Sequence, residues 1–297
     1  MGLRDHGRYD YIPLPDRADY SWPGGKRLAF CVCNNLEIFS YRDGLGSDSA
    51  VLGAPQSHRN HAWRDYGNRV GIWNLFDLLD ESDLPASHNA NSGLLRDYTQ
   101  ITERIVARGD EVVAHGRTNS ERQDSLDEAG ERKLIRDATE EITSVMGHKP
   151  KGWMGPYFAQ SDVTLDLLAE EGYGFMLDWP ADDQPFWMRT RSGPIMSVPY
   201  SVELNDSPAM VFRQESAMSF ERMMTDQFDE MLHQCAKWPL VFTLVLHPFI
   251  IGQPYRLRAL RRALAHMLRH RDDLWITTVG GVYAYCAGLE PGVVPGS

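Results

Sequence analysis

The sequence has few cysteines and no long apolar run, and both shortages exclude classes of protein. Its four cysteines form no C-x-x-C pair and no Cys/His spacing typical of a zinc site. Cys31 and Cys33 alternate within an apolar segment, so they face the same side of one strand and are poorly placed to bond each other. This pattern favours reduced, buried thiols in a cytoplasmic protein. No window predicts a transmembrane helix, and residues 1–10 lack the apolar core of a signal peptide.

Basic residues are also in deficit. The 297 residues include 30 Lys and Arg against 41 Asp and Glu, which gives a net charge of -11. An acidic chain of this kind is not expected to bind nucleic acid, and the lack of apolar segments argues against a membrane partner. The composition, 42% hydrophobic and 24% charged, is that of an ordinary globular protein with a core large enough to need no disulfide.

What the chain does contain is a regular alternation of short apolar runs and amphipathic segments. The apolar runs predict strands within residues 26–36, 84–93, 111–115, 151–157, 175–179, 195–204, 240–246 and 274–279. Helical spacing predicts helices within 63–81, 98–108, 126–146, 162–171, 219–238, 256–269 and from 282 onward. Strands that alternate with helices form a parallel sheet with helices outside it. Seven or eight such strands predict a TIM-like α/β barrel, in a single domain because no linker or repeat interrupts the chain.

Two segments fall outside this alternation. Residues 1–25 carry three prolines between aromatic side chains, which predicts an extended N-terminal arm before a barrel over residues 26–297. The aromatic residues of the arm are suited either to the barrel wall or to a neighbouring subunit. Residues 40–62 have no periodicity and predict a long loop, and loops of this length often carry function.

Polar side chains stand where three of the predicted strands end. Glu37 follows the first strand, His115 follows an apolar run at 112–114, and His247 follows the most apolar strand, 240–246. In α/β barrels the loops after the strands carry the chemistry, so we expect these three side chains in one active site. Each has a structural alternative, because a strand-end carboxylate can be a hydrogen-bonded structural acid and a histidine can be a satisfied part of the core.

Further polar and aromatic residues near the strand ends are candidates for substrate contacts. They are Asn35, Asn91, Asn119, Asp178, Trp179, Asp183 and Glu203. Asn91 is equally suited to a turn, and the two aspartates are equally suited to capping a loop. Trp179 can wall a flat ligand or pack on the barrel rim, and Glu203 can contact substrate or a neighbouring strand end. The residues alone leave these alternatives open.

The segments at the strand ends, taken in order, carry a family resemblance. They are W-P-G-G-K-R-L-A at 22–29, N-L-E at 35–37, Y-G-N-R-V-G-I-W at 66–73, H-G-R-T-N-S at 115–120, G-W-M-G-P at 152–156, D-W-P-A-D-D-Q-P-F-W at 178–187, P-Y-S-V-E-L-N-D at 199–206 and L-H-P-F-I-I-G-Q-P-Y-R at 246–256. The chain resembles the polysaccharide deacetylase (NodB-homology) family. Within it, the chain looks most like the branch of metal-independent allantoinase and bacterial cyclic imide hydrolases (imidases).

The resemblance implies a fold, a reaction and roles for individual residues. The fold would be an irregular (β/α)7-type barrel, and the reaction would be hydrolysis of a C–N bond other than a peptide bond in a small-molecule substrate. Glu37 falls where the family has its base, and His247 falls where it has its acid. His115 and Asn119 would bind a carbonyl or orient water. The family comparison and the aromatic arm favour a homodimer or a homotetramer.

The chain departs from the family pattern at the metal site. The paired acidic motif of the family falls on Glu37 and Ile38, and its H-x-x-x-H motif falls on His115 and Asn119. Isoleucine has no donor atom, and a neutral amide is a poor zinc ligand. We therefore expect no metal and no other cofactor. The alternative is zinc or another divalent metal, held by His115 with Glu37 or Asp178.

The missing metal ligands bear on the substrate. A metal ion acting as Lewis acid supplies several kcal/mol, so a site without one needs a more reactive carbonyl. A cyclic imide or ureide has such a carbonyl, and its second carbonyl stabilises the departing nitrogen. We therefore expect ring opening of a small cyclic imide or ureide by general acid/base catalysis. The alternatives are a metal-dependent N-deacetylase acting on a sugar or other acetamide, and a non-catalytic relative.

Overall fold

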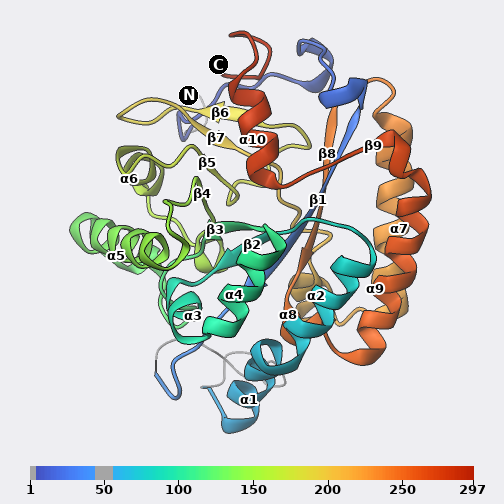
Figure 1. The fold of residues 1–297 in the computed structure, drawn as a ribbon. Coiled ribbons are helices and arrows are strands. Elements are labelled where there is room, and N and C mark those ends of the chain that lie inside the picture. Colours follow the sequence, from blue (N-terminus) through green and yellow to red (C-terminus); the bar gives the residue numbers. More distant parts are fainter. Residues whose placement is uncertain (1–4, 44–55) are drawn as a thin grey trace.

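Nine strands form one curled sheet in the computed structural model, which describes residues 5–43 and 56–297 (Figure 1). Neighbouring strands follow the order β6-β7-β5-β4-β3-β2-β1-β8, and β9 also pairs with β1. All these pairs are parallel except β6 and β7, which are antiparallel. The strands are β1 (Leu28–Leu36), β2 (Ser87–Ala90), β3 (Glu111–Ala114), β4 (Gly152–Trp153), β5 (Phe175–Met176), β6 (Phe186–Met188), β7 (Ile195–Ser197), β8 (Leu240–Leu246) and β9 (Leu274–Ile276). The predicted α/β barrel is confirmed.

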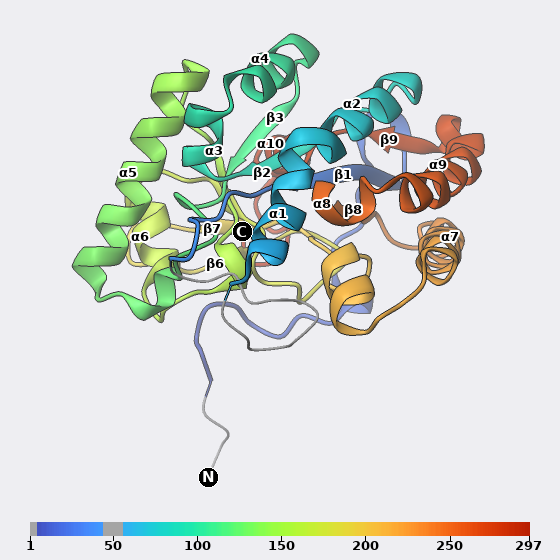
Figure 2. The same cartoon turned by 90° about the horizontal axis from the view of Figure 1, so that it is seen from below.

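The helices form an outer layer around the sheet, as Figure 2 shows from below. They are α1 (His58–Tyr66), α2 (Ile72–Glu81), α3 (Ser92–Asp97), α4 (Thr99–Arg108), α5 (Glu128–Met146), α6 (Thr164–Glu170), α7 (Ala217–Gln234), α8 (Pro248–Ile251), α9 (Pro254–Met267) and α10 (Val279–Ala287). Two π-helical segments, η3 (Gly67–Gly71) and η6 (Ser207–Phe212), and the 3-10 turn η5 (Pro156–Phe158) lie in the loops after the strands.

The two longest strands, β1 and β8, lie side by side at one end of the strand order. They pair from Leu28 with Leu240 through to Asn34 with Leu246, and both are buried over their whole lengths. A strand covered on both faces has to be apolar on both, which explains the unbroken apolar runs in the sequence. All four cysteines are buried and free, as predicted for the thiols. The carboxyl ends of β1 and β8 point to the lower part of Figure 1.

Backbone segments meet directly where α8 packs on η3. A Cβ atom added at Gly71 or at Gly252 would overlap the carbonyl oxygen of Pro248, and one at Gly67 would lie 2.8 Å from the backbone nitrogen of Phe249. Glycine is therefore required for this close approach. The contact fixes the turn that follows His247.

Several boundaries differ from the sequence predictions. The strand predicted over 195–204 ends at Ser197, just before the proline at position 199, which cannot donate to a ladder. The loop predicted over 40–62 gives way to α1 at His58, capped by Ser57, while residues 44–55 lie outside the described chain. The short helices α3 and α8 and the antiparallel strand β6 were not predicted. Their apolar segments are too short to show a period.

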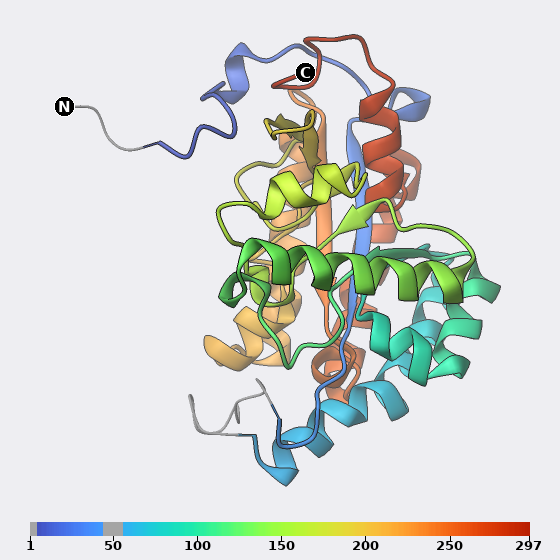
Figure 3. The same cartoon turned by 90° about the vertical axis from the view of Figure 1, so that its left-hand side faces the viewer.

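The described part of the N-terminal arm, residues 5–25, and the C-terminus lie at the end of the molecule opposite the carboxyl ends of β1 and β8 (Figures 1 and 3). The arm is not uniformly extended as predicted, because it contains two 3-10 turns at Leu14–Asp16 and Pro23–Gly25. Tyr9, Tyr20 and Trp22 of the arm pack on the barrel, with the rings of Tyr9 and Phe186 4.8 Å apart, whereas Tyr11 is exposed. Within residues 5–43 and 56–297, no helix is long and apolar enough to cross a membrane.

Candidate active site

A cavity of about 400 Å³ opens among the carboxyl ends of the strands. It brings the three predicted catalytic residues together, because Glu37 follows β1, His115 follows β3 and His247 follows β8. Two of the predicted substrate-contacting residues, Asn35 and Asn119, line it as well. The other lining residues are Trp63, Arg64, Arg122, Met154, Tyr157, Phe158, Asn205, Ser207, Pro208, Val211, Phe212 and Phe249. The walls are therefore largely aromatic and aliphatic, with the polar groups gathered around one carboxylate.

Both histidines face the same oxygen of Glu37. Its Oε1 lies 3.8 Å from His115 Nε2 and 3.6 Å from His247 Nε2. Both distances exceed a direct hydrogen bond, and a polar gap of this size is suited to a bridging water or substrate atom. Burial raises the pKa of Glu37, but the charges of His247 and Arg64 lower it, and the pKa stays below its ordinary value. Glu37 is therefore ionised at neutral pH, as a general base has to be.

His247 is paired with a second carboxylate. Its Nδ1 donates to Asp206 Oδ1 at 2.7 Å, and its backbone N–H donates to Asp206 Oδ2 at 2.9 Å. Burial lowers the pKa of His247, but Asp206 and, more weakly, Glu37 raise it above its ordinary value. Nε2 then carries a proton that points at the cavity, which suits a general acid.

His115 is held by a neutral group instead. Its Nδ1 lies 2.6 Å from the carbonyl oxygen of Met154, which can only accept, so Nδ1 carries the proton. In a neutral imidazole Nε2 is then an acceptor. This buried atom has no hydrogen-bond partner among the described residues, and it faces Glu37. Leaving a buried acceptor unpaired costs free energy of folding, so this atom is suited to accept a hydrogen bond from a water or a substrate N–H.

The predicted asparagines have different places in the structure. Asn91 does not line the cavity; it accepts from the backbone of Ile38 at 2.9 Å and donates to Asn119 Oδ1 at 2.9 Å and to the backbone oxygen of His115. It thereby ties together the loops after β1, β2 and β3. Because the oxygen of Asn119 is taken, its Nδ2 is the group left to donate into the cavity. Asn35 lies at the cavity floor, where its oxygen accepts from the Tyr200 hydroxyl at 3.0 Å.

Four other candidates lie outside the residues that line this cavity. Glu203 is exposed and pairs with Arg213 at 2.6 Å, and Asp183 lines two other hollows of the surface. Trp179 lines a pocket beneath the N-terminal arm, 5.3 Å from the His6 ring. Asp178 is buried, and desolvation raises its pKa to about 7.

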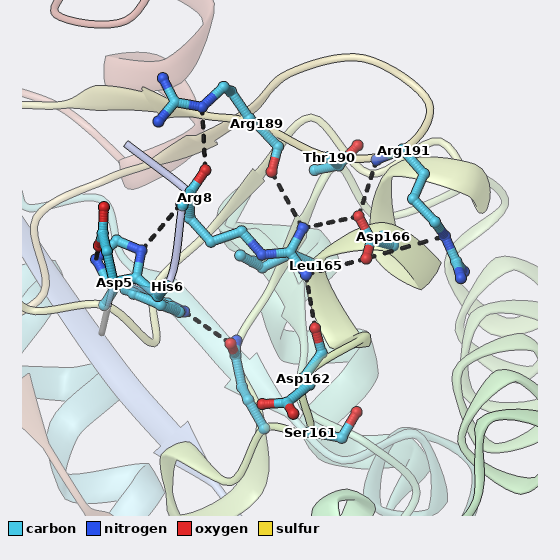
Figure 4. Close-up of a pocket in the computed structure, with 13 residues that line it drawn as sticks. Asp5, His6, Arg8, Ser161, Asp162, Leu165, Asp166, Arg189, Thr190 and Arg191 are labelled. Atoms are coloured by element: carbon cyan, nitrogen blue, oxygen red, sulfur yellow. Dashed lines mark hydrogen bonds and ion pairs between the residues drawn. The ribbon is translucent and has the colours of Figure 1, made fainter. Parts of the chain in front are cut away.

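The pocket beneath the arm is larger, at about 1040 Å³, but its groups satisfy one another (Figure 4). Arg8 donates to Asp166 at 2.8 Å and to the backbone of Asp162 at 2.6 Å. Asp166 also accepts from the backbone of Arg191 at 2.8 Å. This arrangement fastens the arm to the barrel. The smaller cavity around Glu37 has the groups that chemistry needs, so it is the candidate active site.

Several residues of the site were not among the predicted ones. Asp206 stands in the segment P-Y-S-V-E-L-N-D, three residues after the predicted Glu203. Arg64 lies with its guanidinium carbon 3.8 Å from the centre of the Phe39 ring. Tyr157 lines the cavity in a left-handed backbone conformation, φ 62°, which strains a non-glycine residue. No local sequence pattern marks such positions, because they depend on how loops from different strands meet.

The donor set does not fit a divalent metal. Ile38 offers no side-chain donor, and the oxygen of Asn119 is engaged by Asn91. Across residues 5–43 and 56–297, no group of three or more His, Cys, Asp and Glu residues is arranged to hold a metal ion. The two histidines and Glu37 are arranged for proton transfer, with separate partners behind each imidazole.

Part of the chain is similar to a known family. The family model for polysaccharide deacetylase matches residues 64–176, a segment that contains β2, β3, β4 and His115. The chain has a polysaccharide deacetylase domain. A peptidoglycan deacetylase of Helicobacter pylori is 23% identical over 244 residues, which cover 71% of this chain and 82% of that protein.

Two solved structures match nearly the whole chain. The PuuE allantoinase superposes with a TM-score of 0.85 at 25% identity, covering 98% of this chain and 99% of that one. A Pseudomonas aeruginosa PAO1 protein described as a "probable polysaccharide deacetylase" superposes with a TM-score of 0.81 at 25% identity, covering 91% and 94%. The resemblance seen in the sequence is thereby confirmed.

Proposed function

We propose that this C–N hydrolase of the polysaccharide deacetylase family opens the ring of a small cyclic imide or ureide without a metal ion. One observation carries the proposal. Glu37 Oε1 lies between two imidazoles, 3.8 and 3.6 Å away, at the point where the family's metal ligands are replaced by Ile38 and Asn119. The similarity to an allantoinase, an enzyme named for a cyclic ureide, supports the substrate class.

Glu37 acts as the base in this mechanism. A water in the gap between Glu37 Oε1 and His115 Nε2 donates one hydrogen bond to each, because both atoms are acceptors. As the water oxygen attacks the ring carbonyl, its proton passes to Glu37. His115 keeps the water aligned through Nε2, because Nδ1 donates to the Met154 carbonyl.

His247 acts as the acid. Its protonated Nε2 donates to the ring nitrogen as the C–N bond breaks, and Asp206 stabilises the cation until then. Glu37 then returns the proton it received to His247, 3.6 Å away. The new carboxylic acid ionises on release, so each turnover consumes one water and liberates one proton.

Two cavity groups suit the negative charge that develops on the carbonyl oxygen. Asn119 has a free amide N–H, and Arg64 supplies a positive charge that already favours the anionic form of Glu37. The aromatic side chains of Trp63, Phe158 and Phe249 give flat walls for a small ring. An imide is suited to such a site because its carbonyl is electrophilic and its leaving nitrogen is stabilised by the second carbonyl.

The test is a substrate panel on metal-stripped protein. Succinimide, maleimide, hydantoin, dihydrouracil and allantoin are each incubated with the protein, and ring opening is followed by chromatography of the product acid. The Glu37→Gln variant, prepared in parallel, measures the spontaneous background. We expect ring opening of at least one compound, unchanged when a chelator is added.

The second candidate function is a metal-dependent N-deacetylase, which the similarity to a peptidoglycan deacetylase favours. The same protein is therefore incubated with acetylated chitin and peptidoglycan oligomers, with and without zinc, and released acetate is measured. Acetate release that depends on zinc, with all five rings left intact, would replace the proposed function with this one.

A further inference from the structure

A chain of hydrogen bonds runs from the barrel rim to His115. Trp179 Nε1 donates to Gln160 Oε1 at 2.7 Å, and Gln160 Nε2 donates to Asp178 Oδ2 at 2.7 Å. The backbone N–H of Gly155 donates to Asp178 Oδ1 at 2.8 Å. That N–H belongs to the same peptide group as the Met154 carbonyl, which accepts from His115 at 2.6 Å. Asp178 and His115 therefore hold opposite ends of one peptide group.

The direction of each bond in this chain is fixed by chemistry. An indole N–H can only donate, so the amide of Gln160 must turn its oxygen to Trp179 and its NH2 to Asp178. Asp178 consequently faces two donors, one on each oxygen. Only an ionised carboxylate can accept from both Gly155 and Gln160, because an amide or a protonated carboxyl group would point an N–H or O–H at one of these donors.

The loop that contains the 154–155 peptide group depends on contacts with its neighbours to keep its conformation. A Cβ at Gly155 would lie 3.0 Å from the Ala159 carbonyl and 3.4 Å from Asp178 Oδ2, so a side chain here would press on both neighbours. Tyr157 and Phe158, which follow in the loop, both have positive φ, 62° and 55°. A loop with two strained residues depends on its surroundings to keep its conformation.

His115 has one proton and two acceptors that compete for it. The neutral carbonyl of Met154 faces Nδ1, whereas the Glu37 carboxylate faces Nε2 at 3.8 Å. A carboxylate is ordinarily the stronger acceptor. Asp178 in its ionised form, the form that accepts from both donors, places a negative charge on the N–H side of this peptide group. That charge polarises the peptide group and makes its carbonyl a better acceptor, an effect that is large in a buried setting and is lost as pH falls below the Asp178 pKa of about 7.

We propose that Asp178 is a positioning residue for His115: through the 154–155 peptide group, it keeps the imidazole proton on Nδ1 and leaves Nε2 free toward Glu37. This role rests on the proposed function, in which Nε2 accepts from the attacking water. It also gives a reason for a buried carboxylate that lies outside the catalytic cavity.

The first test is Asp178→Asn, which keeps the shape of the side chain but places its NH2 against either Gly155 or Gln160. We expect kcat on the best ring substrate to fall by about 10- to 100-fold, the range found when a group supporting a site residue is lost, with KM changed by less than about threefold. In protein labelled with 15N-histidine, long-range 15N–1H correlation reports the tautomer of His115. We expect the Nδ1–H form of the natural protein to give way to a mixture with Nε2–H.

The second test is rescue by the double variant Asp178→Asn with Gln160→Glu. The amide oxygen at position 178 again accepts from Gly155, and its NH2 donates to the carboxylate introduced at position 160, which also accepts from Trp179. We expect this variant to recover most of kcat and the Nδ1–H tautomer.

Asp110→Asn is the matched control for both tests. Asp110 is a buried carboxylate that accepts from the backbone of Ala86 at 3.1 Å and lies 3.0 Å from His88 Nε2. Its substitution should reduce stability and leave the His115 tautomer unchanged, because it has no contact with the 154–155 peptide group.

The proposal is overturned if Asp178→Asn retains the natural tautomer and kcat, or if the double variant recovers neither. The tautomer is read without turnover, so it tests this role even if no ring substrate is opened. A normal Nδ1–H signal that is lost in Asp178→Asn, beside an inactive natural protein, would contradict the proposed function alone.

Discussion

His115 and His247 face the same oxygen of Glu37, yet the protein holds them differently. His247 donates to a carboxylate, Asp206, whereas His115 donates to a backbone carbonyl of Met154. The first arrangement raises the pKa of its imidazole and keeps a proton on the cavity side. The second leaves an unprotonated nitrogen on the cavity side. Two imidazoles thereby divide the work, one giving a proton and the other accepting a hydrogen bond.

Removing the Glu37 carboxylate, which both imidazoles face, should have the largest effect on activity. We expect Glu37→Gln to lower kcat/KM by about 10³- to 10⁴-fold, because the amide cannot take a proton from water. The variant has nearly the same volume, so its thermal unfolding midpoint should stay close to that of the natural protein. Steady-state kinetics and circular dichroism measure the two quantities. Residual activity near the natural level would show that another group is the base.

Restoring the family's metal ligands at positions 38 and 119 should turn His115 from a residue that accepts a hydrogen bond from water into a zinc ligand. We expect Ile38→Asp with Asn119→His to bind zinc at least about 100-fold more tightly than the natural protein, since carboxylate and imidazole replace groups that do not ligate zinc. Isothermal titration calorimetry measures both affinities. Either single substitution serves as the control. Equal zinc affinity in the natural protein and the double variant would contradict our account of the lost site.

Removing the carboxylate behind His247 should weaken the acid while the base is kept. We expect Asp206→Asn to lower kcat by about 100-fold. In the natural protein, kcat/KM should rise with pH as Glu37 ionises, below pH 4.5, and fall as His247 loses its proton, above pH 6.5. Without Asp206 the pKa of His247 falls, so only the alkaline limb should move, toward lower pH.

The same pairing has a consequence for stability. Because the pKa of His247 is raised on folding, its contribution is present below pH 6.5 and is lost as pH rises through the folded value. Asp206→Asn should therefore reduce the free energy of unfolding more at pH 6 than at pH 9, measured by urea denaturation. Equal losses at the two pH values would mean that the pair does not titrate as described.

Removing the charge of Arg64 should have the smallest effect on activity, and it should change the pKa values of both Glu37 and His247. Arg64 lowers the pKa of Glu37 and that of His247, so Arg64→Met should move both limbs of the pH profile toward higher pH. We expect kcat/KM at pH 7 to fall by less than about tenfold, because this charge is partly solvated. Movement of one limb alone would show that Arg64 does not lie in the field of both groups.

The alternation of strands and helices could be predicted from the sequence because it follows local rules. The meeting of Glu37, His115 and His247 at one cavity could be predicted for the same reason. Apolar runs predicted β1 and β8, and the polar residue after each strand pointed to Glu37, His115 and His247. The partners of these residues could not be found in this way. Met154 supports His115 through its backbone, which no side-chain pattern records. Asp206 and Glu203 stand three residues apart, and only the folded loop shows which one meets His247.

The glycine contact between η3 and α8 limits how this enzyme can change. Gly71 and Gly252 leave no room for a side chain against the Pro248 carbonyl, so neither glycine can be replaced without moving the turn that follows His247. The η6 segment carries Phe212, which is exposed at 62% and lines the same cavity. If the protein has the function that we propose, ring substrates of other sizes are more readily accommodated by variation at Phe212 than at the two glycines, and a mutant library aimed at η6 would explore specificity with Glu37, His115 and His247 left in place.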